Sequence, residues 1–173
     1  MAPGWSIDKN HSSITFEINH FFTPVVGTFK DFEGTLEFDP NDLATSKADF
    51  TVQIASVSTN NERRDKDLVS NSFFNAKKYP VMTFKSTGFS KDGDNYTVKG
   101  NLTIKDVTKE VSIPFKVLGY GDHPMKKGKK ILAVRAEFTL DRTDYHVGEG
   151  NWAATAVVGD EVKVTVLLEA VGK

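Results

Sequence analysis

Apolar and polar residues alternate along most of this 173-residue chain, in short segments separated by polar, Gly- or Pro-containing turns. In residues 12–20, for example, Ile14, Phe16 and Ile18 alternate with polar residues. Successive side chains of a strand point to opposite faces, so this pattern predicts β-strands with one buried face. Eight segments have the pattern: 12–20, 32–38, 48–54, 82–86, 96–104, 111–117, 132–140 and 162–168. Residues 5–8 are a candidate for a ninth, and the short connections favour antiparallel neighbours.

The segment 58–69 interrupts this pattern, because it is charged and its apolar residues do not alternate. Thr59 or Asn60 can cap a short helix here, with acidic residues following in its first turn. Arg64 and Leu68 then share one face of the helix, because residues four apart are neighbours on a helix surface.

About eight antiparallel strands, each with one apolar face, must bury those faces against each other. A closed barrel and a two-sheet sandwich both achieve this, and the alternation alone does not distinguish them. An eight-stranded barrel leaves an interior just large enough for side chains or one small ligand. The chain length, with 39% hydrophobic and 26% charged residues, indicates one globular domain over residues 1–173.

The composition argues against several classes of function. A net charge of −1 is unlike the strongly basic balance of most nucleic-acid-binding proteins, so we predict no nucleic-acid partner. The chain has no cysteine, and therefore no disulfide, thiolate metal site or cysteine nucleophile. Its four histidines are not spaced as pairs of metal ligands, and no motif brings a catalytic acid and base together. We predict no metal, no cofactor and no enzymatic activity.

The first residues lack the basic and apolar regions of a signal peptide, and no run of 18 apolar residues occurs. We therefore expect a cytoplasmic protein, or a periplasmic or secreted one if a signal peptide has been removed.

Three features allow two interpretations each. His20 either contacts a ligand headgroup at the end of an apolar stripe or lies at the rim, bonded to backbone. The basic run Lys126–Lys130 either docks transiently on an anionic membrane surface or forms a solvated hairpin tip. Phe21–Phe22 and Phe73–Phe74 either line a mouth that admits apolar cargo or close the core.

Nine motifs extend over nearly the whole chain: Trp5–Ser12, Phe16–Phe21, Val26–Phe29, Phe32–Gly34, Asn61–Leu68, Phe73–Phe74, Tyr79–Thr87, Gly100–Lys109 and Asp141–Tyr145. Together they resemble the YceI-like family, and such a combination is hard to obtain by chance. The resemblance implies an all-β, eight-stranded antiparallel, lipocalin-like barrel with one short helix and an elongated apolar cavity. It also implies an isoprenoid ligand, such as a polyprenyl diphosphate or a quinone tail. Family members have no established catalytic residues, many are periplasmic, and homodimers are common.

The inward stripes of the predicted strands are almost wholly apolar, which suits a hydrocarbon tail. The ligand's head needs hydrogen-bond donors, which Arg64, His20, Arg142 or Tyr145 can supply. We expect the ligand to be contacted by Phe16, Ile18, His20, Phe32, Leu36, Phe50, Val52, Arg64, Leu68, Phe84, Leu102, Phe115, Val134, Ala136, Phe138, Arg142 and Tyr145.

The leading hypothesis is therefore a protein that binds and carries or stores a long-chain isoprenoid-type lipid. One alternative is an enzyme or accessory protein that acts on an isoprenoid or quinone. The other is a fully packed structural or stress-response barrel.

Overall fold

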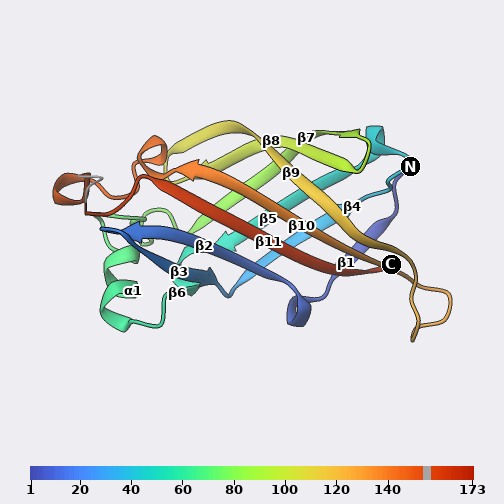
Figure 1. Ribbon diagram of the computed structural model, residues 1–173, viewed down its shortest axis with the longest axis horizontal. Helices are drawn as coiled ribbons and strands as arrows, with labels where there is room; N and C mark the ends of the chain where they lie inside the picture. The colour runs from blue at the N-terminus through green and yellow to red at the C-terminus, as the bar shows by residue number, and fades with distance from the viewer. Residues whose placement is uncertain (154–156) are drawn as a thin grey trace.

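The alternating segments pair in antiparallel fashion and close into an elongated β-barrel, as the computed structural model of residues 1–153 and 157–173 shows (Figure 1). Closure is completed where β11 pairs with β1 as well as with β10. The strands are β1 (Gly4–Ile7), β2 (Ser13–His20), β3 (Thr23–Phe29), β4 (Phe32–Glu37), β5 (Lys47–Gln53), β6 (Val57–Ser58), β7 (Val81–Asp92), β8 (Asn95–Ile104), β9 (Val107–Asp122), β10 (Lys130–Asp141) and β11 (Glu161–Gly172).

Three strand paths are each interrupted once by an irregular segment. β1 continues into β2 through the 3-10 turn η1 (Lys9–His11), and β3 continues into β4 through residues 30–31. β5 continues into β6 through η3 (Ile54–Ser56). These three paths and β7 to β11 make an eight-stranded antiparallel barrel, which confirms the predicted fold and decides between barrel and sandwich. Further 3-10 turns are η2 (Leu43–Thr45), η4 (Arg142–Tyr145) and η5 (Gly150–Ala153).

The alternation does not indicate β3 or the two-residue β6, and β3 escapes it because Pro24 and Gly27 interrupt the pattern. In the structure, Pro24 lies where β3 pairs with β2 alone. β6 joins β3 only at Thr28 and Phe29, so no second ladder needs a donor from Pro24. The predicted ninth segment is confirmed as β1.

Helix α1 (Glu62–Val69) confirms the predicted helix, but its N-cap is Asn61. The Asn61 side chain accepts a hydrogen bond from the Arg64 backbone N–H at 3.0 Å. Thr59 is not the cap, because its N–H and its hydroxyl both donate to Asp65 Oδ1, at 2.9 and 2.6 Å. The helix lies at one end of the barrel, and both chain termini lie toward the other (Figure 1).

Aromatic side chains close the end that carries the termini. Trp5 is 2% exposed, and its indole N–H donates to the Phe38 carbonyl at 2.9 Å. The Phe38 ring packs against Phe89, Tyr96 and Phe115, with ring centroids 5.8–6.0 Å apart. This plug fixes one end of the interior.

Glycines allow large rings to cover the inner wall. Gly27 is the cross-strand partner of Phe16, and Gly34 is that of Phe50. A Cβ atom on Gly27 would lie 2.3 Å from the Phe16 ring, and one on Gly34 would lie 2.4 Å from the Phe50 ring. Each ring therefore occupies the place that a side chain on the neighbouring strand would take.

Candidate ligand-binding cavity

A cavity of about 750 Å³ extends through the inside of the barrel. Phe16, Phe50, Phe84 and Phe138 face it from four different strands. These rings are only half-buried, although they point inward. Rings in a core at the usual packing density would be fully enclosed by protein, so their exposure shows that they border open space.

Of the 17 predicted contact residues, 16 lie on the cavity wall: Phe16, Ile18, His20, Leu36, Phe50, Val52, Arg64, Leu68, Phe84, Leu102, Phe115, Val134, Ala136, Phe138, Arg142 and Tyr145. Their contact with a ligand stays a prediction. Phe32 is not on the wall. It begins β4 directly after the bend at residues 30–31, and it packs in a buried cluster with Phe29 and Ile54.

The cavity opens at the end that carries α1, between this helix and the β2–β3 hairpin. The exposed wall residues Asn19, His20 and Thr23 belong to the hairpin, and Arg63 and Asp67 belong to the helix. We call this opening the mouth. Because most of the deeper wall is aliphatic or aromatic, a ligand with one polar end would place that end at the mouth.

Arg64 is less available at the mouth than its position on α1 predicted. Its Nε donates to the Thr59 hydroxyl and its Nη2 donates to the Thr59 carbonyl, both at 2.7 Å. These bonds fasten the helix to the end of β6. Arg63, which the sequence analysis did not select, is exposed at the mouth and forms no ion pair with the described residues. The sequence did contain a signal for its position: Arg63 and Asp67 are four residues apart and therefore share one face of the helix, the face that lines the mouth.

Arg142 lies on the wall, but it has no donor left for a headgroup. The five N–H groups donate to the carbonyl oxygens of Val147, Gly148, Trp152, Val158 and Gly159, at 2.7–3.1 Å. Burial lowers the pKa of the Arg142 guanidinium, and the carboxylates of Asp160 and Asp141 oppose that shift. The expectation that Arg142 supplies a headgroup donor was therefore wrong: it organises the backbone beside the mouth.

Tyr145, from η4, remains a candidate donor. Its side chain is 2% exposed and lies on the cavity wall. Burial raises the pKa of the Tyr145 phenol, so the hydroxyl keeps its proton at neutral pH. The hydroxyl forms no hydrogen bond with the described part of the chain, which leaves its proton available to a ligand oxygen.

The structure also places His20, Phe73–Phe74 and the Lys126–Lys130 hairpin relative to the mouth. His20 lies at the rim of the mouth, where its backbone bridges to Val158 and its ring stacks edge-on against Phe21 at 4.7 Å. Phe73 and Phe74 line the cavity. The hairpin with Lys126–Lys130 lies at the opposite end of the barrel from α1 (Figure 1). No described helix is long and apolar enough to span a membrane.

Comparison with known proteins identifies the family. The model of the YceI-like domain matches residues 5–170. Protein YceI of Escherichia coli O17:K52:H18 is 40% identical over 150 residues, which are 85% of this chain and 78% of that protein. Protein YceI of Salmonella arizonae is 39% identical over the same shares.

Solved structures share the fold. The crystal structure of Burkholderia cenocepacia BcnA has a TM-score of 0.86 at 27% identity, over 95% of this chain and 99% of that chain. The Campylobacter jejuni YCEI protein has a TM-score of 0.78 at 32% identity, over 87% and 86%. A domain from Saccharophagus degradans has a TM-score of 0.73 at 13% identity, over 100% of both chains. Because the family model matches nearly the whole length of this chain, the chain belongs to the YceI-like family.

Proposed function

We propose that this protein binds a long-chain isoprenoid-type lipid in the barrel cavity and carries or stores it. The observation that carries the proposal is the set of half-buried inward rings, because an apolar wall that borders open space suits a hydrocarbon chain. Burial of such a chain contributes about 0.8 kcal/mol per CH₂ group. Membership of the YceI-like family supports the proposal, as does the Saccharophagus degradans neighbour, which is described as a polyisoprenoid binding domain.

The volume of the cavity limits the length of chain that it holds. At about 30 Å³ for a group of the size of a water molecule or methylene, 750 Å³ accommodates about 25 chain carbons, or about five isoprene units. The candidate ligands are a polyprenyl diphosphate and an isoprenoid quinone. Arg63 at the mouth favours an anionic head, and the Tyr145 hydroxyl can donate to either head.

The direct test is to purify the protein without detergent, extract it with organic solvent, and identify any co-purified lipid by mass spectrometry. Prenyl chains of increasing length should then bind the delipidated protein with affinity that rises up to about 25 carbons and levels off beyond. Absence of both a bound lipid and any binding of added prenyl chains or fatty acids would contradict the proposal.

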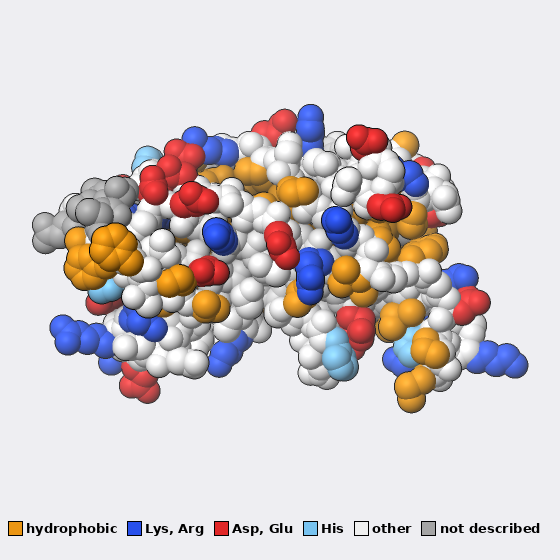
Figure 2. All heavy atoms as spheres, in the orientation of Figure 1, with side chains coloured by type: hydrophobic (Ala, Val, Ile, Leu, Met, Phe, Trp, Pro, Cys, Tyr) orange, Lys and Arg blue, Asp and Glu red, His pale blue; other side chains and the backbone are white. Residues whose placement is uncertain are grey.

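We propose further that the ligand enters from a membrane at the mouth. Phe21 and Phe22 form the tip of the β2–β3 hairpin beside the mouth, and are 58% and 96% exposed. Phe21 has a φ of 51°, a left-handed conformation that two-residue hairpins usually give to Gly, Asn or Asp. Two exposed rings at such a turn are suited to insertion into lipid. Figure 2 shows hydrophobic side chains at this end and also at the opposite end of the barrel. The mouth end is favoured over the Lys126–Lys130 hairpin because Phe21 and Phe22 adjoin residues that line the cavity.

Phe22→Ser should slow transfer of a fluorescent prenyl lipid from vesicles to the protein, while the affinity for the same lipid in dilute detergent stays unchanged. Met125→Ser is the matched control, because Met125 is 88% exposed on the opposite hairpin. Equal transfer rates for both variants and the unmodified protein would exclude entry by the hairpin tip.

A further inference from the structure

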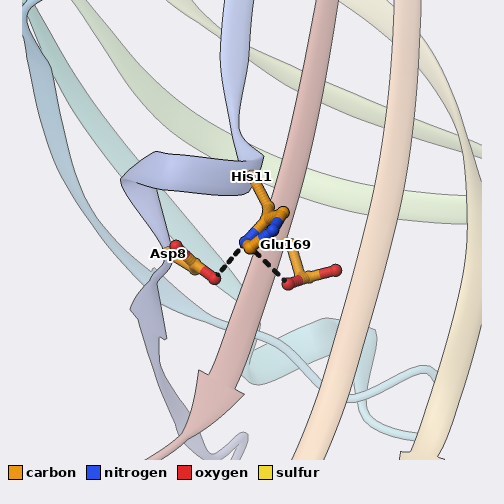
Figure 3. A group of neighbouring side chains, drawn as sticks. All are labelled: Asp8, His11 and Glu169. Carbon is orange, nitrogen blue, oxygen red and sulfur yellow. Dashed lines mark hydrogen bonds and ion pairs between the residues drawn. The ribbon is translucent and has the colours of Figure 1, made fainter.

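Three metal-ligating side chains meet outside the barrel, at the place where β11 changes partners (Figure 3). Asp8 and His11 flank the interruption between β1 and β2, and Glu169 projects from β11 toward them. His11 Nδ1 lies 2.7 Å from Asp8 Oδ2 and 3.5 Å from Glu169 Oε2. One ligand atom from each residue lies within 4.8 Å of the others.

The backbone holds these side chains in place without using the atoms that converge. The Asp8 N–H donates to the Glu169 carbonyl at 2.8 Å, which joins the two segments. The Glu169 N–H donates to the Ser12 hydroxyl at 3.0 Å. The second carboxylate oxygen of Asp8 accepts the Asn10 N–H at 3.0 Å, which orients the carboxylate. Asp8 Oδ2 and Glu169 Oε2 are then directed at His11.

The three ligand atoms lie close enough together for one first-row metal ion to contact them all once the hydrogen bond between His11 and Asp8 opens. Tetrahedral metal–ligand distances of about 2.0–2.2 Å place neighbouring ligands about 3.3–3.6 Å apart. The distance of 3.5 Å between His11 Nδ1 and Glu169 Oε2 lies in this range, and the distance of 2.7 Å to Asp8 Oδ2 is that of the hydrogen bond that the ion would replace. The His11 side chain is 67% exposed, so water can complete the coordination. Two carboxylates beside one imidazole leave an excess of negative charge, which favours a divalent cation.

We propose that Asp8, His11 and Glu169 form a binding site for a divalent zinc ion. One imidazole nitrogen and two carboxylate oxygens are ligands that zinc accepts in proteins, with water in the fourth position. Binding replaces the proton on His11 Nδ1, so one proton leaves to solvent when the imidazole is protonated at that atom. The ion joins the interruption between β1 and β2 to β11, and thus stabilises the closure of the barrel rather than contacting the lipid.

The spacing of the histidines could not reveal this site, because it contains a single histidine and its third ligand lies 158 positions beyond His11 in the sequence. The sequence-based prediction of no metal rested on paired histidines. Folding brings Glu169 to the other two residues through the β1–β11 pairing.

The test is calorimetric titration of the delipidated protein with zinc chloride, followed by the thermal midpoint with and without zinc. The unmodified protein should bind one zinc per chain, and its midpoint should rise. His11→Gln should lower zinc affinity about 100-fold, and Co²⁺ bound in place of zinc should lose its visible absorption bands in this variant. His146→Gln is the matched control, because among the described residues His146 contacts a single carboxylate, that of Asp106, with Nδ1 and Oδ1 3.2 Å apart.

Glu169→Gln is the second variant, since it removes the charge of one ligand at nearly constant side-chain size and keeps the hydrogen bond between His11 and Asp8. It should still weaken zinc binding at least 10-fold. Equal zinc affinity in the unmodified protein and Glu169→Gln would overturn the proposal, as would an equal loss in His146→Gln. Lipid binding is measured separately, so failure of this site leaves the proposed function untouched.

Discussion

Arg142 and Arg63 both lie on the cavity wall, but they have different roles because the N–H groups of Arg142 are bonded within the protein. Arg142 donates all five N–H groups to carbonyl oxygens of the segments that follow η4. Arg63 lies exposed at the mouth and has no ion pair within the described ranges. The planar guanidinium of Arg142 is suited to several carbonyls at once, whereas Arg63 can bind an incoming anion.

Arg142→Lys should therefore destabilise the protein. An ammonium group has three donors, so at least two of the five carbonyl oxygens lose their partner, and each unpaired buried carbonyl costs about 1–3 kcal/mol. We expect a loss of about 2–6 kcal/mol in the free energy of unfolding, measured by urea denaturation. Arg63→Lys is the control and should unfold like the unmodified protein. Unchanged stability of Arg142→Lys would show that water replaces the lost donors.

Arg63→Ala should weaken binding of a prenyl diphosphate by about 1 kcal/mol, since exposed charge pairs contribute little more than this. A neutral quinone of the same chain length should bind as before. Lys66→Ala serves as the control, because Lys66 is exposed on α1 but does not line the cavity. Arg64→Ala should lower stability instead, by removing the bonds to Thr59. Equal losses for both lipids in Arg63→Ala would mean that the head lies elsewhere.

His11 should give the stability a pH dependence. The hydrogen bond to Asp8 raises the His11 pKa above its usual 6.5, so the stabilisation is fully present below pH 6.5 and is lost as the pH rises through the raised value. The same bond lowers the Asp8 pKa below 3.8, so that contribution is lost as the pH falls through the lowered value. Thermal midpoints of the unmodified protein and His11→Gln, measured in EDTA, should differ most near pH 5–6 and converge at alkaline pH. A constant difference would contradict this assignment.

At the scale of elements, pairs of glycine and phenylalanine decide how far the wall extends inward. In the pairs Phe16–Gly27 and Phe50–Gly34, a ring covers the glycine of the neighbouring strand. The sequence shows both residue types, but their spacings of 11 and 16 positions have no meaning until the register of the strands is known. The register brings each ring opposite its glycine, and this leaves the centre of the barrel open.

Gly34→Ala should reduce the capacity of the cavity. The added methyl group would lie 2.4 Å from the Phe50 ring and 2.8 Å from the Asp49 carbonyl oxygen, so both the ring and the neighbouring β5 backbone have to shift. Chains of about 25 carbons should bind more weakly than they do to the unmodified protein, while short chains should bind equally well. Gly88→Ala on β7 is the control, because no heavy atom lies within 4 Å of its added methyl. Loss of affinity that does not depend on chain length would contradict this explanation.

Prediction of the elements from sequence was most complete where one face of a strand is buried. Period-two alternation locates a strand such as β10, whose exposed Arg135 and Glu137 alternate with inward residues. It fails at β3, where Pro24 is tolerated because one edge has no partner. The cap of α1 was misplaced by one or two positions, because Thr59 bonds to Asp65, and this contact forms only when the helix packs against β6.

At the scale of the whole molecule, the inward face is partly packed and partly open. Ala136 and Ala170 are both buried alanines on neighbouring strands, at 8% and 1% exposure. Ala136 lies on the cavity wall. Ala170 shares a buried cluster with Ala136, but it does not line the cavity and is paired with Leu132 and Ile7.

Ala136→Phe should keep most of the stability of the lipid-free protein, because its ring can enter the cavity, and should weaken binding of long chains. Ala170→Phe should instead cost about 1–3 kcal/mol or more in the free energy of unfolding, as overpacked cores do. The denaturation midpoint and binding as a function of chain length separate the two effects. A large loss of midpoint with unchanged lipid binding in Ala136→Phe would mean that this position faces packed protein.

The sequence by itself determined the strands with one buried face, the helix near residue 62 and the apolar stripes, because each depends on residues close together in the chain. Only the tertiary structure decided that the sheet closes, since closure depends on the pairing of β1 with β11. It also decided the use of each polar group. Arg64 and Arg142 read alike in sequence as free cations, but two N–H groups of Arg64 donate to Thr59 and all five of Arg142 donate to carbonyl oxygens. These partners lie 5 to 17 positions from each arginine, outside the three- and four-residue spacings of a helix surface, so the local pattern does not reveal them.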